Sequence, residues 1–126
     1  MIHILIADAH AAVRSCIRDL LSDAILETTF AEAADREQTL SLLATQEFSL
    51  ALLDINTPGS MGLDLLSAII ELYPKLPVIL LGTEPERRYA RPCMDAGAAA
   101  YINVDDAPER LAHEVQRSLN ERGEMR

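Results

Sequence analysis

Basic residues, and lysine above all, are scarce in this sequence. Eleven Lys and Arg residues face 20 Asp and Glu residues in a chain of 126, so the net charge is −9, and Lys75 is the single lysine. A surface with this balance repels a phosphate backbone. The composition therefore argues against direct binding of nucleic acid by this chain.

Long apolar runs and cysteines are also few. Runs such as Pro77–Leu81 fall far below the about 20 residues that a membrane span needs, and no basic-then-apolar leader opens the sequence. We therefore expect a cytoplasmic protein without a membrane segment. Cys16 and Cys93 are expected to be reduced thiols on different helices, packed as small hydrophobes. The length suits one globular domain, here residues 1–120, followed by a polar tail at 121–126.

Apolar runs of strand type alternate with patterns of helical spacing along the whole chain. Strands are expected at Ile2–Ala7, Glu27–Ala31, Ser49–Leu53, Pro77–Leu81 and Ala98–Ile102, with a helix after each. Parallel strands need crossover connections, and right-handed crossovers place helices on both faces of the sheet. The sequence thus predicts an α/β fold: a flavodoxin-like, doubly wound, five-stranded parallel sheet in a three-layer α/β/α sandwich.

Three of the expected helices carry specific signals. Asp35 with Gln38 forms a capping-box start for a helix that turns Leu40, Leu43 and Ala44 inward. Pro92 lies inside the helical stretch 86–96, which is therefore expected to be kinked, short or split. Pro108 opens the last helix, whose inward positions are Leu111, Val115 and Leu119.

Two aspartates mark the ends of buried strands. Asp8 stops the first strand and Asp54 the third, and a Pro-Gly loop follows Asp54. In open parallel sheets, ligands bind at the carboxyl ends of the strands where the strand order reverses. We therefore expect the two carboxylates to lie together at a functional site, active or vestigial.

Several short segments of the chain resemble segments of a known protein family, in the same order and at the same spacing. Together they resemble the receiver domain of two-component response regulators, a CheY-like fold, and most closely the receivers of LuxR/NarL-type transcriptional regulators. The likeness covers almost the whole chain and is carried by Ile6–His10 with Arg14, Leu53–Gly59, Gly62-Leu63, Pro77–Leu81 and Ala96–Tyr101.

The resemblance implies Mg²⁺-dependent transfer of a phosphoryl group to a carboxylate. By this likeness Asp54 is the phosphoacceptor, Asp8 and Asp54 are metal ligands together with the backbone carbonyl of Asn56, and Tyr101 is an aromatic switch. The metal neutralises charge on the phosphoryl oxygens, and a Ser or Thr hydroxyl and a Lys ammonium hold those oxygens.

The sequence departs from the family pattern three times. Ala9 replaces the second acid of the metal pair, Gly82 stands in place of the Ser or Thr, and Val104 stands in place of the Lys. Thr83 could substitute by a one-residue slip, whereas Lys75 belongs to the opposite edge of the sheet. The resemblance therefore implies a degenerate site in which Mg²⁺ is weakly held or lost.

We interpret the chain as an atypical, or pseudo-, receiver that controls a transcriptional output through protein–protein contact or dimerisation. Its expected partners are a sensor histidine kinase or another regulatory protein and a second copy, with DNA reached only through an output domain outside this chain. The alternative is a conventional receiver that a sensor histidine kinase phosphorylates on Asp54. Such a receiver would be an enzyme only in phosphorylating and dephosphorylating itself.

Two further alternatives stay open. Asp8-Ala9-His10 is similar to the start of a cobalamin-binding motif, but Val13 stands where that motif has glycine, so a cofactor-binding flavodoxin-like domain is a weaker interpretation. The neighbouring bases Arg87, Arg88 and Arg91 form either an ordinary solvated helix face, with the first two able to reach toward the site, or an anchor for an acidic partner.

Overall fold

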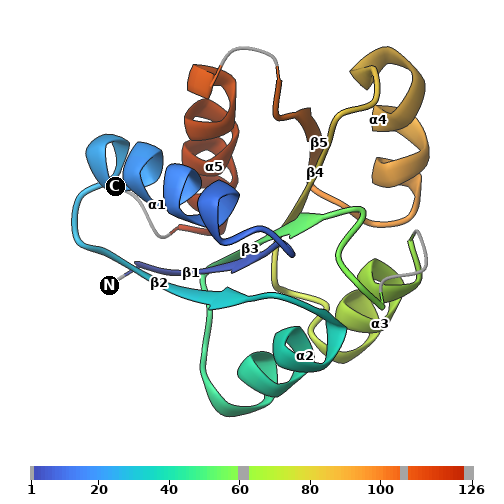
Figure 1. The fold of residues 1–126 in the computed structure, drawn as a ribbon, viewed down its shortest axis with the longest axis horizontal. Coiled ribbons are helices and arrows are strands. Elements are labelled where there is room, and N and C mark those ends of the chain that lie inside the picture. Colours follow the sequence, from blue (N-terminus) through green and yellow to red (C-terminus); the bar gives the residue numbers. More distant parts are fainter. Residues whose placement is uncertain (1, 60–62, 106–107, 124–126) are drawn as a thin grey trace.

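The computed structural model of the chain describes residues 2–59, 63–105 and 108–123. Five parallel strands and five helices alternate along it, as the sequence predicts (Figure 1). The strands are β1 Ile2–Ala7, β2 Thr28–Ala33, β3 Leu50–Asp54, β4 Val78–Gly82 and β5 Ala100–Asn103. The helices are α1 Ala11–Ala24, α2 Arg36–Thr45, α3 Asp64–Leu72, α4 Glu86–Asp95 and α5 Pro108–Arg122.

The sheet has the strand order β2-β1-β3-β4-β5, and every pair is parallel. The chain leaves β1 toward β2 on one side and returns to β3 on the other, so the order reverses between β1 and β3. Ala7 is paired with Leu53 in this register, which places the residues that end these two strands side by side. The predicted doubly wound fold is confirmed.

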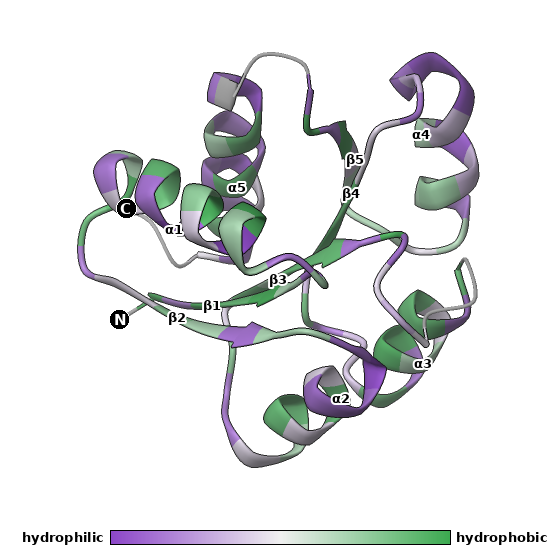
Figure 2. Ribbon diagram, viewed as in Figure 1, coloured by the Kyte–Doolittle hydropathy of each residue, from purple (hydrophilic) through white to green (hydrophobic). Residues whose placement is uncertain are grey.

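The core has two halves because side chains alternate between the faces of the strands. Ile4 and Ile6 face α1 and α5, whereas Leu5 and Ala7 face α2, α3 and α4. Figure 2 shows the hydrophobic residues of the strands in the middle of the molecule, between these two layers. Within the described residues, no helix has the length and apolar character needed to cross a membrane.

Local hydrogen bonds and backbone conformation determine where α2 and β2 begin. The Asp35 side chain accepts a hydrogen bond from the Gln38 amide (2.8 Å), and the Gln38 side chain accepts one from the Ala34 amide (2.8 Å), as the capping signal predicts. β2 begins one residue later than expected because Glu27 adopts a positive φ of 56° and belongs to the preceding turn.

Two sequence-based expectations about buried side chains, those for Ala44 and Cys16, need correction. Ala44 is exposed, because α2 buries Thr39 and Leu43 instead. Of the three outcomes expected for α4, the structure shows the short one: the helix is not split, since Pro92 lies on its exposed side close to its end. Both cysteines are free, and Cys93 is buried, but Cys16 is exposed on α1 rather than packed. In addition, α5 continues through Arg122, into the stretch expected to be a tail.

The N-cap of α2 offers a test of the fold. We expect Asp35→Ala to lower the free energy of unfolding by about 1 kcal/mol, because the substitution leaves the Gln38 amide without its acceptor. Asp23→Ala, at an exposed site on α1, serves as the control and should change it by less than about 0.5 kcal/mol. Urea denaturation followed by circular dichroism measures both, and equal effects would show that Asp35 contributes charge rather than a cap.

Candidate functional site

Two carboxyl groups meet at the carboxyl edge of the sheet, where the strand order reverses. Asp8 directly follows β1 and is 1% exposed, and Asp54 is the last residue of β3 and is partly exposed. Ala7 pairs with Leu53 in the sheet, so the two aspartates that follow them lie side by side, and Asp8 contributes to raising the pKa of Asp54. The expectation that these aspartates lie together is therefore confirmed.

Asp8 is held by residues of the following loop and helix. Its Oδ1 accepts a hydrogen bond from the His10 amide (2.7 Å) and lies 3.1 Å from His10 Nδ1. Arg14 Nη1 donates to the backbone carbonyl of Asp8 (2.6 Å), while Arg14 Nε donates to Glu32 (2.8 Å). The guanidinium thus fixes the backbone at the end of β1 and is occupied by a different carboxylate, that of Glu32.

Asp54 is fixed by the loop that follows it. The Asn56 amide donates to Asp54 Oδ1 (2.7 Å), and the Thr57 hydroxyl donates to the carbonyl of Asp54 (2.7 Å). Thr57 is buried, and its hydroxyl also lies 3.3 Å from the carbonyl of Ala7, so it links the ends of β1 and β3. Sequence reasoning assigned Asn56 to this site but missed Thr57, which links the two strand ends.

The carboxyl pair has an electrostatic consequence. Burial is the largest of the effects that together raise the pKa of Asp54 from 3.8 to about 6. The neighbouring Asp8 raises this pKa as well, whereas the Asn56 amide and the charge of His10 lower it. The one charge that favours ionised Asp54 among the effects on its pKa is that of His10, and it is the smallest of these effects. Ionised Asp54 is therefore an electrostatically unfavourable group at this edge of the sheet.

A divalent cation fits this donor set only in part. Two carboxylates beside a loop suit Mg²⁺, which keeps several water ligands. However, the described residues hold no cluster of three or more His, Cys, Asp or Glu side chains that could bind a metal, and the residue next to Asp8 is Ala9. Asp8 and Asp54 would hold such an ion, and its chemistry would be to offset their negative charge.

The Gly82 position is filled by another side chain. A Cβ atom built on Gly82 would lie too close to the Tyr101 hydroxyl and 3.0 Å from the edge of its ring. Tyr101 is 3% exposed, and its hydroxyl donates to the carbonyl of Glu84 (3.0 Å) and accepts from the amide of Glu84 (3.1 Å). The ring therefore occupies the space that a side chain at position 82 would need.

The structure also places the two other residues that the resemblance associates with phosphoryl contacts, Thr83 and Val104. Thr83 is exposed beyond the end of β4, while Gly82 itself pairs with Asn103 in the sheet. Val104 is partly buried against the core layer of α1 and α5, where it lines an apolar groove of about 500 Å³. Position 104 thus makes an apolar contact with the core.

A second set of polar contacts joins the loops that follow β4 and β5. Asn103 donates from its amide to the Glu86 carboxylate (3.1 Å) and from its side chain to the carbonyl of Glu84 (3.4 Å). Glu86 also pairs with Arg110 of α5, and this guanidinium lowers the pKa of Glu86. Sequence reasoning missed this link because it depends on the strand register, which no local pattern reveals.

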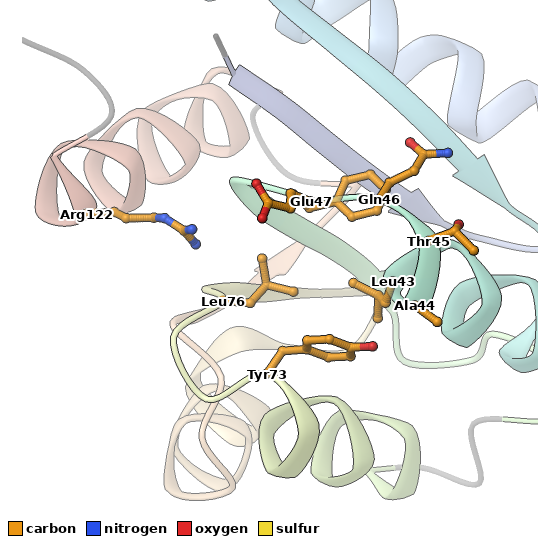
Figure 3. A pocket seen from close by; sticks show the side chains of 9 residues that line it. Leu43, Ala44, Thr45, Gln46, Glu47, Tyr73, Leu76 and Arg122 are labelled. Atoms are coloured by element: carbon orange, nitrogen blue, oxygen red, sulfur yellow. The ribbon is translucent and has the colours of Figure 1, made fainter.

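A separate pocket of about 500 Å³ lies at the opposite edge of the sheet (Figure 3). Gln46 and Glu47 precede β3, Leu76 precedes β4, and the Arg122 side chain points toward them from α5. The Arg122 guanidinium donates to the carbonyls of Ser49 and Lys75 (3.3 Å each). Because the pocket borders the amino ends of the strands, it is separate from the carboxyl pair. Lys75 lies at this same remote edge, as expected.

Comparison with known proteins gives a consistent result. Residues 4–116 match the family model described as the response regulator receiver domain. The chain is 29% identical to the glycerol metabolism activator of Pseudomonas putida, covering 95% of this chain and 55% of that protein. It is 28% identical to the response regulator UvrY of Escherichia coli, covering 92% of this chain and 53% of that protein.

Among solved structures, the chain resembles a LuxR family DNA-binding response regulator from Silicibacter pomeroyi. The TM-score is 0.83 and the identity 26%, with 95% of this chain and 93% of that chain covered. The chain spans about half the length of the curated relatives it matches.

The contact between positions 82 and 101 can be tested by a double-mutant cycle. We expect Gly82→Ala to lower the free energy of unfolding by about 1–3 kcal/mol, because the added methyl group displaces the Tyr101 ring and its two hydrogen bonds. In a Tyr101→Leu background the same substitution should cost at least about 1 kcal/mol less. Urea denaturation measures all four proteins, and an equal cost in both backgrounds would contradict the contact.

The raised pKa of Asp54 predicts a pH-dependent stability. The folded state binds this proton more tightly than the unfolded state, so the free energy of unfolding falls as pH rises from 3.8 to about 6 and then levels off. We therefore expect Asp54→Asn to be more stable than the unsubstituted protein at about pH 7.5, on the order of 1–2 kcal/mol after allowing for partial exposure.

The same advantage should shrink toward zero near pH 4 in urea denaturation curves. Asp23→Asn, at an exposed site on α1, is the matched control and should show no such trend. A constant difference between Asp54→Asn and the unsubstituted protein across this pH range would argue against a raised pKa.

Proposed function

Because this chain belongs to the response regulator receiver domain family, we propose that it is an atypical receiver, which signals through protein contacts instead of phosphoryl transfer to Asp54. It keeps the acceptor position and one acid of the metal pair, Asp8. The residues that would hold a transferred phosphoryl group are replaced by Gly82 and Val104. The proposal is that the domain works in two-component signalling as a binding module.

The observation that carries the proposal is the position of Tyr101. Its ring fills the volume beside Gly82, and its hydroxyl is satisfied in both directions by the Glu84 backbone. A conformational change coupled to phosphorylation needs a group at position 82 that moves toward the new oxygens. Glycine has no such group, so this arrangement supports a domain whose Tyr101 stays inward regardless of phosphate.

The magnitude of the missing interactions supports the same proposal. Loss of one charge-stabilising donor typically costs about 3–4 kcal/mol of transition-state stabilisation, and two donors are replaced here. If the two losses act even partly independently, transfer slows by about 10⁴-fold or more. Asp8 and Asp54 would retain weak Mg²⁺ affinity, but a metal bound there would leave the other side of the phosphoryl group without donors.

Chemical phosphorylation tests this proposal. With Mg²⁺ and millimolar acetyl phosphate, we expect the intact mass of the protein to stay unchanged, since neither Gly82 nor Val104 donates to the phosphoryl oxygens. With Mg²⁺ and beryllofluoride, the amide spectrum should likewise show no saturable change around Asp54. An adduct of one phosphoryl group, absent from Asp54→Asn, would refute the proposal.

A variant with the missing groups restored provides the positive control. Ala9→Asp, Gly82→Thr and Val104→Lys together should gain a mass adduct that Asp54→Asn removes in the same background. Circular dichroism checks that this variant folds. If it does not, Val104→Lys with Ala9→Asp, which leaves Gly82 and Tyr101 unchanged, takes its place.

A conventional receiver is the second candidate, and one observation favours it. Asp54 remains partly exposed at the strand edge, beside Asp8 and the Asn56 loop. In that case a sensor histidine kinase would supply the phosphoryl group, Mg²⁺ would be the cofactor, and the domain would be an enzyme only toward itself. The experiment above separates the two candidates.

We further propose that the protein acts in the cytoplasm and controls transcription. The relatives include a metabolism activator and a response regulator, and a structural relative is a DNA-binding regulator. Because the chain spans about half of those curated relatives, contact with DNA would be made by a domain outside these 126 residues. Dimerisation through α1 and α5, or through α4, β5 and α5, is one way to couple this domain to such an output.

A further inference from the structure

We propose that a cavity at the amino ends of β4 and β5 binds the carboxylate group of a small organic anion. The cavity has a volume of about 300 Å³ and lies beside the pocket of Figure 3, with which it shares Leu76 and Arg122. The polar and charged side chains that line it are those of Lys75, Ser118, Glu121 and Arg122. This inference goes beyond the proposed function, because the cavity lies at the edge of the sheet opposite the carboxyl pair.

The hydroxyl group of Ser118 is the observation that points to a ligand. Ser118 is 3% exposed and lines the cavity from α5. Among the described residues, its Oγ is the one buried side-chain oxygen or nitrogen atom without a hydrogen-bond partner. Leaving such a group unpaired costs stability, and alanine would fill the same position without this cost. The hydroxyl is therefore available to donate to a group that enters the cavity.

Lys75 supplies the positive charge at this site. It is the single lysine of the chain, and its ammonium group makes no hydrogen bond or ion pair within residues 2–59, 63–105 and 108–123. The Arg122 guanidinium donates to the backbone carbonyls of Lys75 and Ser49 (3.3 Å each), so it ties the loop that carries Lys75 to the end of α5. The loop is thus ordered before a ligand arrives, which lowers the entropy that binding costs.

The acidic residue that lines the cavity does not neutralise Lys75. Glu121 accepts a hydrogen bond from Arg117 on the preceding turn of α5 (2.8 Å). Its carboxylate is therefore engaged along the helix, and the Lys75 ammonium is left without a counterion from the described residues. An external carboxylate can take that place.

The polar groups and the surrounding charge favour a carboxylate over a phosphate. One ammonium group and one hydroxyl group match the two oxygen atoms of a carboxylate. The net charge of the chain is −9, and α3, α4 and α5 end at this edge of the sheet with the negative ends of their dipoles. Repulsion from these charges grows with the charge of the ligand, so a singly charged anion binds better than a doubly charged one.

The remaining walls of the cavity suit a short hydrocarbon group. They are formed by Pro74, Leu76, Pro77, Gly97 and Ala99, from the loops that precede β4 and β5. The volume lies at the lower end of the range for small-molecule sites, about 300–1,000 Å³. The expected ligand is therefore a small monocarboxylate with a short apolar chain.

Titration of the ¹⁵N-labelled chain with sodium butyrate at constant ionic strength tests the proposal. We expect saturable shifts of the amides of Lys75, Leu76 and Ser118, with a dissociation constant on the order of millimolar, as suits a ligand of few atoms. Butyramide, which has the same shape without the charge, should cause no saturable shift. Inorganic phosphate should bind at least about fivefold more weakly than butyrate.

Two substitutions separate the contributions of charge and hydroxyl. Lys75→Ala should weaken butyrate binding by about tenfold or more, whereas the control Arg91→Ala, which removes an exposed base from α4, should leave it within about twofold. Ser118→Ala should weaken binding by about fivefold or more, yet leave the Tm of the free protein unchanged or higher, because it removes an unpaired buried group. The control Ser22→Ala, at an exposed site on α1, should change neither quantity.

Four results would overturn the proposal. These are shifts that do not saturate or that lie outside this edge of the sheet, butyramide or phosphate binding as tightly as butyrate, an affinity that survives both substitutions, and a Tm lowered by Ser118→Ala. The last would show that the hydroxyl already has a partner in the free protein. Asp54→Asn should bind butyrate as the unsubstituted protein does, since position 54 lies at the opposite edge of the sheet.

Discussion

The parallel register of β1, β3, β4 and β5 is the constraint on which the candidate site depends. It brings Asp8, Asp54 and Gly82 to one edge of the sheet, although they are separated by long stretches of sequence. A one-residue shift in any pairing would turn these side chains toward the opposite face. The hydrophobic alternation of the strands therefore fixes the geometry of polar residues that contribute nothing to the core.

That geometry creates an electrostatic conflict at the edge of the sheet. Asp8 is buried with hydrogen bonds from His10, and Asp54 lies beside it with a pKa raised to about 6. The nearest guanidinium, that of Arg14, is engaged with a carbonyl and with Glu32. The two acids therefore lie together with His10 as the basic side chain beside them, while Tyr101 and Val104 pack into the two opposite layers of the core.

The sequence predicted what depends on periodicity and local chemistry. Ile2–Ala7 is a strand because every residue but one is apolar, and Asp35 begins α2 because its side chain caps the helix. The pairing of Asp8 with Asp54 followed from the sheet topology alone. These features need no knowledge of how distant side chains pack.

The remaining features depend on tertiary contacts and were beyond the sequence. The inward position of Tyr101 depends on the empty volume at Gly82, and the tie of Glu86 to Asn103 and Arg110 depends on the spacing of two loops. The exposure of Ala44 depends on which side of α2 meets the sheet. In each case a local pattern allows several arrangements, and packing selects one.

The shared volume of Gly82 and Tyr101 also determines the order in which substitutions are tolerated. Any residue larger than glycine at position 82 meets an aromatic ring that is already seated, so position 101 must change or reorient first. Replacing Gly82 by a residue with a hydroxyl group therefore takes two substitutions, one at each position. The protein with only position 82 altered is less stable than the protein with only position 101 altered. The absence of a side chain at position 82 thus fixes the order in which these two positions can be substituted without loss of stability.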